Sequence, residues 1–331
     1  MIGFAGPKIS EQYLTAVSLS NRDTAWQIPV DKFHGSGRQI ATNDSYIYVR
    51  REDSPGFHVY LQDGTFLKEI AFPDTLVSSM IGAHPILMGN QLFMPNYTHF
   101  YTYDISDAVN PVLGWQLDFD HKVQSVATDS QGGLYVGVYD RLNVTDAIYR
   151  LDPANGNILW QASTYTDKAL EHGTPNSMEV NGDKLIVSAG GTVQAFDTAT
   201  GERLWVSERL LCPGDGTSVT YAITFAEGNA YLAPAGGACV FAVDLTDGSI
   251  VWTHSASIAA DANFSYGGKV SYRNGVIYAS NARLWALDAG TGKVLSLAKH
   301  LDSNGQSTYV KEYNGQILVW GKELIAYKPI R

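Results

Sequence analysis

Residues Ala195–Trp205 read AFDTATGERLW. The Asp side chain caps a turn, the Gly takes the positive φ of a tight corner, and the alternation of side chains resumes after it. This order of residues predicts a β-hairpin that presents one large aromatic side chain, Trp205, to whatever packs next to it.

The same pattern recurs along the chain. Its other copies are Leu151–Trp160 (LDPANGNILW), Ala242–Trp252 (AVDLTDGSIVW) and Ala286–Ser296 (ALDAGTGKVLS), the last with Ser in the Trp place. The tryptophans at 160, 205 and 252 lie 45 and 47 residues apart. A repeat of this length, built from four short strands, is typical of β-propeller blades.

The strand pattern predicts an all-β fold, a seven-bladed β-propeller of four-stranded antiparallel blades in one domain over residues 1–331. The last blade, at about 307–331, lacks an outer strand, whereas about 13–30 offers a spare hairpin with no inner strands in front of it. We expect this N-terminal strand to complete the last blade, which removes open sheet edges. Eight blades is the alternative, with the N-terminal segment in an extra blade.

Composition supports this class and excludes others. The chain is 17% charged and 11% aromatic, with 32 Gly and 19 Tyr, which is a turn-rich β composition. Its net charge of −10 comes without a basic stripe and argues against nucleic-acid binding. With no signal-peptide pattern and no membrane-spanning window, we expect a soluble protein without membrane insertion. A surface rich in Ser, Thr and Asn leans slightly toward an extracytoplasmic location.

The hairpin A-x-D-x-x-T-G-x-x-x-W, best kept at Ala195–Trp205 and Ala242–Trp252, resembles the repeat of the pyrroloquinoline-quinone-like (PQQ-like) propellers. That family includes quinoprotein dehydrogenases, the lipoprotein propeller of the outer-membrane barrel assembly machine and sensor domains. Most members bind no quinone, so the resemblance implies a fold and no cofactor. The vicinal Cys-Cys pair of the dehydrogenases does not occur in this sequence, which ranks a quinone-dependent dehydrogenase last.

One large aromatic residue per repeat falls where neighbouring blades pack. These residues are Trp26, Trp115, Trp160, Trp205 and Trp252, and we interpret them as structural. The two cysteines leave two alternatives open. Separate buried thiols are favoured narrowly on base rates. The repeat frame, however, places Cys212 and Cys239 in loops on the same face, so a disulfide fits, and it would imply an oxidising compartment.

Loops that lead into the innermost strands gather side chains able to do chemistry. The candidate ring is His34, Arg38, His84, His121, Glu171, His172, Asp215, Asp261 and Tyr266. Three imidazoles, His34, His121 and His172, would suit a transition metal, and a His with a Tyr and an Arg would suit proton abstraction beside a carboxylate. The blander interpretation, which we favour, is that these are solvated residues on blades whose loops never meet.

The sequence contains no strong catalytic spacing such as His-Glu-x-x-His, Gly-x-Ser-x-Gly or a P-loop. Our leading hypothesis is therefore a non-catalytic binding or scaffold propeller, with a protein partner favoured over a small ligand and no cofactor. The alternative is an enzyme at the axial face, a His- or metal-dependent lyase or hydrolase acting on carbohydrate.

Overall fold

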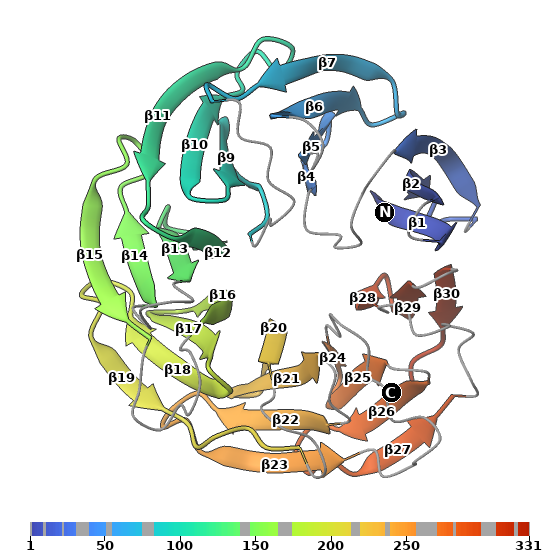
Figure 1. Ribbon diagram of the computed structural model, residues 1–331. Helices are drawn as coiled ribbons and strands as arrows, with labels where there is room; N and C mark the ends of the chain where they lie inside the picture. The colour runs from blue at the N-terminus through green and yellow to red at the C-terminus, as the bar shows by residue number, and fades with distance from the viewer. Residues whose placement is uncertain are drawn as a thin grey trace. The chain divides into compact units, whose positions relative to one another are not determined.

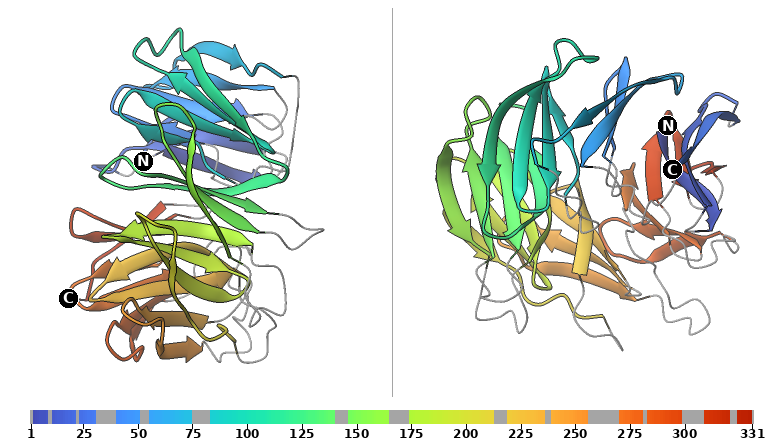
Figure 2. Two further views of the ribbon diagram at one scale, coloured as in Figure 1. Left: turned by 90° about the vertical axis from the view of Figure 1, so that its left-hand side faces the viewer. Right: turned by 45° about the horizontal axis from the view of Figure 1, so that its top comes forward.

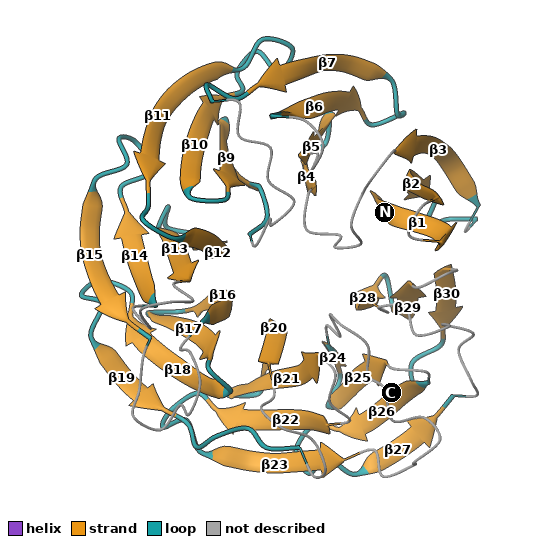
Figure 3. Ribbon diagram, viewed as in Figure 1, coloured by secondary structure: helices purple, strands orange, loops and turns teal. Residues whose placement is uncertain are grey.

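The computed structural model describes most of the chain. The described residues are 2–8, 11–21, 23–30, 40–50, 55–74, 83–139, 146–164, 174–212, 219–235, 239–255, 270–280, 283–298, 309–320 and 324–330. Figure 3 draws only strands and loops in this part of the chain. It contains no helix long and apolar enough to cross a membrane.

Contacts divide the chain into two compact units. Unit 1 is Met1–Asp140 with Tyr149–Leu159, and unit 2 is Arg141–Ile148 with Trp160–Arg331. The single domain over 1–331 therefore stays a prediction, and each unit is described by itself.

Unit 1 contains three complete antiparallel sheets (Figure 1). The first is β1 (Ile2–Lys8), β2 (Glu11–Val17) and β3 (Thr24–Val30); the second is β4 (Ile40–Thr42), β5 (Tyr46–Arg50), β6 (Gly56–Leu61) and β7 (Phe66–Ala71); the third is β8 (Ile86–Met88), β9 (Gln91–Asn96), β10 (His99–Asp104) and β11 (Val112–Asp118).

A fourth sheet holds residues of both units. It consists of β12 (Lys122–Thr128), β13 (Leu134–Tyr139), β14 (Ala147–Leu151) and β15 (Ile158–Ser163). In every four-stranded sheet the strands follow chain order, so each is a meander from an innermost to an outermost strand.

Unit 2 contains four sheets of the same kind. They are β16 (Pro175–Asn181), β17 (Lys184–Ala189), β18 (Thr192–Asp197) and β19 (Arg203–Val206); β20 (Val219–Ala226), β21 (Asn229–Ala235), β22 (Cys239–Asp244) and β23 (Ile250–Ser255); β24 (Ser271–Arg273), β25 (Val276–Ser280), β26 (Leu284–Asp288) and β27 (Val294–Leu297); and β28 (Tyr309–Tyr313), β29 (Gln316–Trp320) and β30 (Leu324–Tyr327). The turned views in Figure 2 show the twist of these sheets.

The hairpin that opens the sequence pattern forms as its residues dictate. Asp197 Oδ1 accepts hydrogen bonds from the backbone N–H groups of Ala199 (2.9 Å) and Thr200 (2.8 Å). Gly201 takes φ of 75°, a value that side-chain-bearing residues rarely adopt. Ala195 then pairs with Trp205 across β18 and β19. The turn thus sets the register and fixes the direction of the tryptophan.

The apolar core lies between successive sheets. The two middle strands of each four-stranded sheet are buried on both faces, as in β17 and β18, whereas the outermost strand β19 is largely exposed. One cluster joins Ile186 and Val193 of one sheet to Phe241 and Val243 of the next. Burial on both faces explains why the middle strands read as continuous apolar runs.

The all-β class and the four-stranded antiparallel sheets are confirmed. The N-terminal segment needs a correction, because β1 pairs with β2 in front of the hairpin that we expected to stand alone. Gly3, Gly6 and Pro7 disguise β1, since these residues are depleted in strands. The number of blades stays a prediction: the described strands form eight sheets, and seven blades require β1–β3 and β28–β30 to share one blade.

Candidate binding site on the loop face

Two kinds of connection lie at the same end of a sheet, and we call this end the loop face of the unit to which the sheet belongs. In the third sheet, the segment that leaves β11 donates to the turn between β9 and β10, from Phe119 N to Thr98 O (2.8 Å) and from Val123 N to Tyr97 O (2.7 Å). In unit 2, the segment that leaves β19 likewise donates from Leu210 N to Gly191 O (2.8 Å). The loop face is therefore built from connections between sheets and from turns between second and third strands.

The opposite end, the turn face, holds the sheets together through a repeated contact that we call the tryptophan latch. Each latch tryptophan donates its indole N–H to a backbone carbonyl in the last turn of the following sheet. The five pairs are Trp26 with Gln62 (2.8 Å), Trp115 with Pro153 (2.8 Å), Trp160 with Thr198 (3.0 Å), Trp205 with Leu245 (3.2 Å) and Trp252 with Ala289 (2.8 Å).

The latch also explains the glycine of the motif. The tryptophan ring covers the positive-φ glycine of that turn, and a Cβ there would lie only 2.5–2.8 Å from the ring. The covered residues are Gly64, Gly156, Gly201, Gly248 and Gly292. Aromatic area, a hydrogen bond and a required glycine are thus combined in one contact.

One boundary within unit 1 departs from this pattern. Between the second and third sheets, Lys68 pairs with Val59 in the register that a latch tryptophan takes elsewhere. Its Nζ donates to Asn110 Oδ1 (2.8 Å) in the turn of the third sheet. That turn, Asp104–Pro111, is closed by Asp107 and Asn110 side-chain bonds instead of a glycine.

The loop-face end of the same boundary buries a charge. Arg50, at the end of β5, is 0% exposed, donates from Nη2 to Asn96 Oδ1 of β9 and lies over the Phe72 ring at 5.9 Å. A buried guanidinium is costly to desolvate and persists where its position is fixed by polar and aromatic partners. This side chain therefore ties the second sheet to the third.

Next to it, His99 lies between two carboxylates that reach the surface. Its Nδ1 donates to Asp118 Oδ1 (2.7 Å), and its Nε2 is 3.6 Å from Asp74 Oδ2. Asp118 also accepts from Gln116 Nε2 (2.9 Å), and Tyr101 donates its hydroxyl to Asp74. We call Asp74, His99 and Asp118 the loop-face triad; their side chains are 29%, 24% and 59% exposed.

The surroundings shift the titration of these groups. The hydrogen bonds from His99 and Gln116 hold the pKa of Asp118 below its usual range, which keeps this carboxylate ionised. Burial, and after it the hydrogen bond to Asp74, raises the pKa of Tyr101. Burial, with the Asp74 charge as a second cause, also raises the pKa of Tyr103. The two phenols therefore stay neutral.

Two members of the ring predicted from sequence lie in the described residues. His84 is exposed before β8, and His121 directly precedes β12, in the segment bonded to the β9–β10 turn. The other members, His34, Arg38, Glu171, His172, Asp215, Asp261 and Tyr266, lie outside the described residues. No cluster of three His, Cys, Asp or Glu suited to a metal occurs in the part that is described.

Arg50, Asp74, His99 and Asp118 are not among the residues predicted from the sequence. The predicted ring lies in loops that lead into innermost strands, whereas His99 starts a third strand and Asp118 ends an outermost one. The order of the strands could have pointed to these residues, because the turn before a third strand lies at the same end of its sheet as the loop that leads into an innermost strand.

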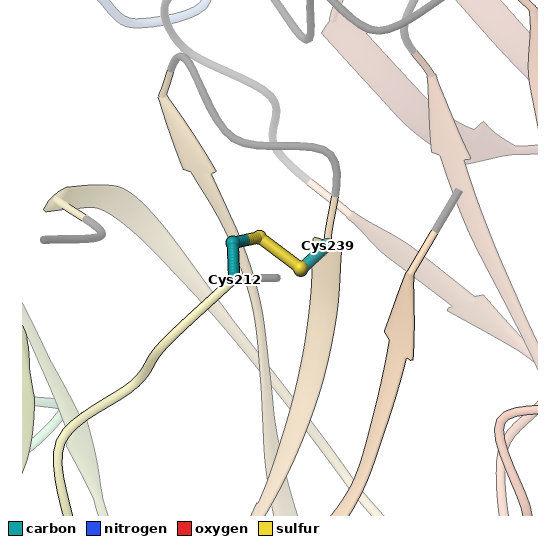
Figure 4. Close-up of a disulfide and its surroundings, with 2 residues drawn as sticks. All are labelled: Cys212 and Cys239. Carbon is teal, nitrogen blue, oxygen red and sulfur yellow. A yellow bond between two sulfur atoms is a disulfide. The ribbon is translucent and has the colours of Figure 1, made fainter. Parts of the chain in front are cut away.

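Cys212 and Cys239 form a disulfide (Figure 4). Their Cα atoms are 5.8 Å apart, and both residues are buried in the core between two sheets of unit 2. The bond joins the segment after β19 to the first residue of β22.

The family model described as "Outer membrane protein assembly factor BamB" matches residues 107–323. The structure of BamB from Moraxella catarrhalis has a TM-score of 0.66 at 15% identity, covering 98% of this chain and 94% of that one. The chain matches no curated protein.

Two further solved structures share the fold. The computationally designed Ika8 protein has a TM-score of 0.70 at 11% identity, covering 99% of this chain and 96% of that one. Quinohemoprotein alcohol dehydrogenase from Comamonas testosteroni has a TM-score of 0.69 at 12% identity, covering 96% of this chain and 70% of that one. The chain therefore has a β-propeller fold and belongs to the PQQ-like repeat family whose model is described as outer membrane protein assembly factor BamB.

Proposed function

We propose that this chain is a non-catalytic propeller that binds a protein partner and acts as a scaffold. The observation that carries the proposal is the family match over residues 107–323, because the model's description is of an assembly factor. The loop face supports it, since the hydrogen bond between the partly exposed His99 and the exposed Asp118 holds both side chains in a fixed orientation at the surface.

We further propose that the protein works without a bound cofactor in an oxidising, extracytoplasmic compartment. The buried Cys212–Cys239 disulfide supports the compartment, because such bonds persist outside the reducing cytosol. The likeness to an alcohol dehydrogenase, at 12% identity, concerns the fold alone and carries no activity to this chain.

Affinity capture with reciprocal tagging tests the function. The tagged full chain is used to isolate partners, each partner found is tagged in turn, and the pair is mixed after purification. The expected result is a complex of defined stoichiometry that survives purification. Turnover of a small substrate by the purified chain, with no protein that binds it reciprocally, would overturn the proposal.

A further inference from the structure

Four asparagines in the described part of the chain are followed directly by glycine. They are Asn155, Asn181, Asn274 and Asn314. In such a pair the backbone nitrogen of the glycine can attack the side-chain amide carbon of the asparagine, because glycine has no side chain to obstruct the approach. The four pairs share this chemistry, so differences between them come from the structure around each one.

The pair Asn155–Gly156 is held at both reacting groups. The Asn155 side chain donates from Nδ2 to Asp152 Oδ2 (2.7 Å) and accepts at Oδ1 from Asn157 N (2.9 Å). The Gly156 N–H donates to Asp152 O (2.8 Å), and the Trp115 ring covers this glycine. Neither the amide carbon nor the attacking nitrogen can reorient without breaking these contacts.

Two further pairs form tight turns in which the attacking nitrogen is engaged. They are Asn274–Gly275, between β24 and β25, and Asn314–Gly315, between β28 and β29. The glycine N–H of the first pair donates to the hydroxyl oxygen of Tyr272 (3.0 Å), and that of the second donates to Glu312 Oε1 (3.0 Å). A nitrogen that donates a hydrogen bond keeps its proton and its direction, which slows its attack on the amide carbon.

The pair Asn181–Gly182 lacks these restraints. Asn181 ends β16, Gly182 begins the turn to β17, and both residues are exposed. Within the described residues the Asn181 side chain makes no hydrogen bond, the Gly182 N–H donates none, and nothing lies within 4 Å of a Cβ added to Gly182. Solvent can therefore take the amide proton, and the Asn181 side chain is free to turn toward the nitrogen.

The turn that contains this pair also supports a latch. The carbonyl oxygen of Asp183 accepts hydrogen bonds from Thr198 N (2.9 Å) and Thr198 Oγ1 (3.0 Å), which ties the β16–β17 turn to the β18–β19 turn. The carbonyl oxygen of the same Thr198 accepts the indole N–H of Trp160 (3.0 Å). A change in backbone length at residue 181 thus acts on a contact that lies beside a tryptophan latch.

We propose that Asn181–Gly182 is a site of spontaneous backbone modification, which converts Asn181 into isoaspartate and aspartate and loosens the turn tied to Thr198. A bond forms between Gly182 N and Asn181 Cγ, the Cγ–Nδ2 bond breaks, and ammonia leaves with the amide proton, which yields a cyclic imide. Water then opens the ring by adding its hydroxyl to either ring carbonyl carbon and its proton to the nitrogen. Isoaspartate, one of the two products, carries an additional methylene group in the backbone.

Incubation of the full chain at neutral and mildly alkaline pH, followed by peptide mapping of the four pairs, tests the site. We expect Asn181 to convert about fivefold to tenfold faster than the other three, the factor that one retained hydrogen bond on the attacking nitrogen imposes. The product should be a mixture of isoaspartate and aspartate, and the four rates should converge in the urea-unfolded chain. Conversion of Asn181 no faster than the others in the folded chain, aspartate as its sole product, or the same order of rates after unfolding would overturn the site.

Tyr272→Phe is the matched variant, because it removes the acceptor of the Gly275 N–H and leaves Asn274 in place. Conversion of Asn274 should then accelerate toward the rate of Asn181. An unchanged rate at Asn274 would overturn the argument that the free nitrogen selects the site.

The consequence for the turn is measured on the modified fraction, which carries a new negative charge and is isolated by ion exchange. Its urea unfolding midpoint should lie below that of Asn181→Asp, which has the same charge on a backbone of ordinary length. Equal midpoints would overturn the loosening of the turn tied to Thr198.

Discussion

The indole nitrogen of Trp252 lies 2.8 Å from the carbonyl oxygen of Ala289, in the last turn of the next sheet. The ring covers Gly292, so one side chain supplies area, a directional bond and a close fit. Stability of the sheet boundaries should depend on such latches more than on their exposed neighbours.

Trp252→Ala is expected to lower the free energy of unfolding by about 3 kcal/mol, because packing and the hydrogen bond are lost together. Trp252→Phe should cost less, with the lost bond accounting for about 1 kcal/mol. Val251→Ala, at a 45% exposed position of the same strand, should change it by no more than about 0.5 kcal/mol. Urea unfolding of the three variants checks this order. Equal losses of free energy of unfolding in Trp252→Ala and Val251→Ala would contradict a stabilising role of the latch.

Gly201→Ala tests the fit of a latch against simple backbone strain. Gly201 has φ of 75°, and a Cβ would lie 2.7 Å from the Trp160 ring. Gly182 has φ of 63° with nothing within 4 Å of the added Cβ. Gly182→Ala should cost about 1 kcal/mol from strain alone, and Gly201→Ala about 2–3 kcal/mol because the ring must also move. Unfolding midpoints that fall equally in both variants would refute the close contact.

The latches show why the fold is readable from sequence. In three copies a glycine at positive φ follows the turn's Asp, and a tryptophan stands eight residues after that Asp, at 152/160, 197/205 and 244/252. A local pattern such as Asp197 with Trp205 therefore identifies a sheet of this kind without any long-range information. β1 was not predicted because its Gly and Pro residues are disfavoured in strands. An edge strand tolerates them, and its position at the edge is known only from its pairing with β2.

The candidate site was harder to predict because its members come from different sheets. Arg50 and Asn96 lie 46 residues apart, and Asp74 and Tyr101 lie 27 apart. No local spacing encodes such pairs, since the packing of two sheets brings them together. Two features of the sequence mark this boundary: Lys68 stands in the tryptophan place, and the Asp104–Pro111 turn has no glycine.

Loss of the Cys212–Cys239 bond should destabilise unit 2. The bond joins residues 27 apart, and closing a loop of this length contributes about 3.5 kcal/mol by restricting the unfolded chain. Urea unfolding of the wild type with a dithiol reductant should match that of Cys212→Ala/Cys239→Ala, both shifted to lower urea. An unfolding midpoint that reductant leaves in place would show that the bond does not carry this stability.

Tyr48→Phe should reveal the cost of an unsatisfied hydroxyl. Tyr48 is fully buried, and its oxygen has no partner among the described residues. The variant should therefore unfold with equal or up to about 1 kcal/mol higher free energy at pH 7. A loss of 2 kcal/mol or more would mean that the hydroxyl has a partner that matters.

Tyr48 should also make the free energy of unfolding depend on pH in the alkaline range. Burial raises the pKa of Tyr48 to about 12, against about 10 for an unfolded chain. Below pH 10 the phenol is neutral in both the folded and the unfolded chain. As the pH rises from 10 toward 12 the phenol ionises more readily in the unfolded chain, so the free energy of unfolding falls. The advantage of Tyr48→Phe should therefore widen between pH 10 and 12, and parallel stability curves would contradict the shift.

Site-specific photo-crosslinking tests the central claim, binding of a protein partner through the loop face, most directly. A photoreactive residue replaces Asp120, exposed on the loop face of unit 1, or Thr65, exposed in the β6–β7 turn on the turn face of the same unit. We expect one defined protein adduct from position 120 and none from position 65. Adducts from both positions alike, or from position 65 alone, would contradict binding through the loop face.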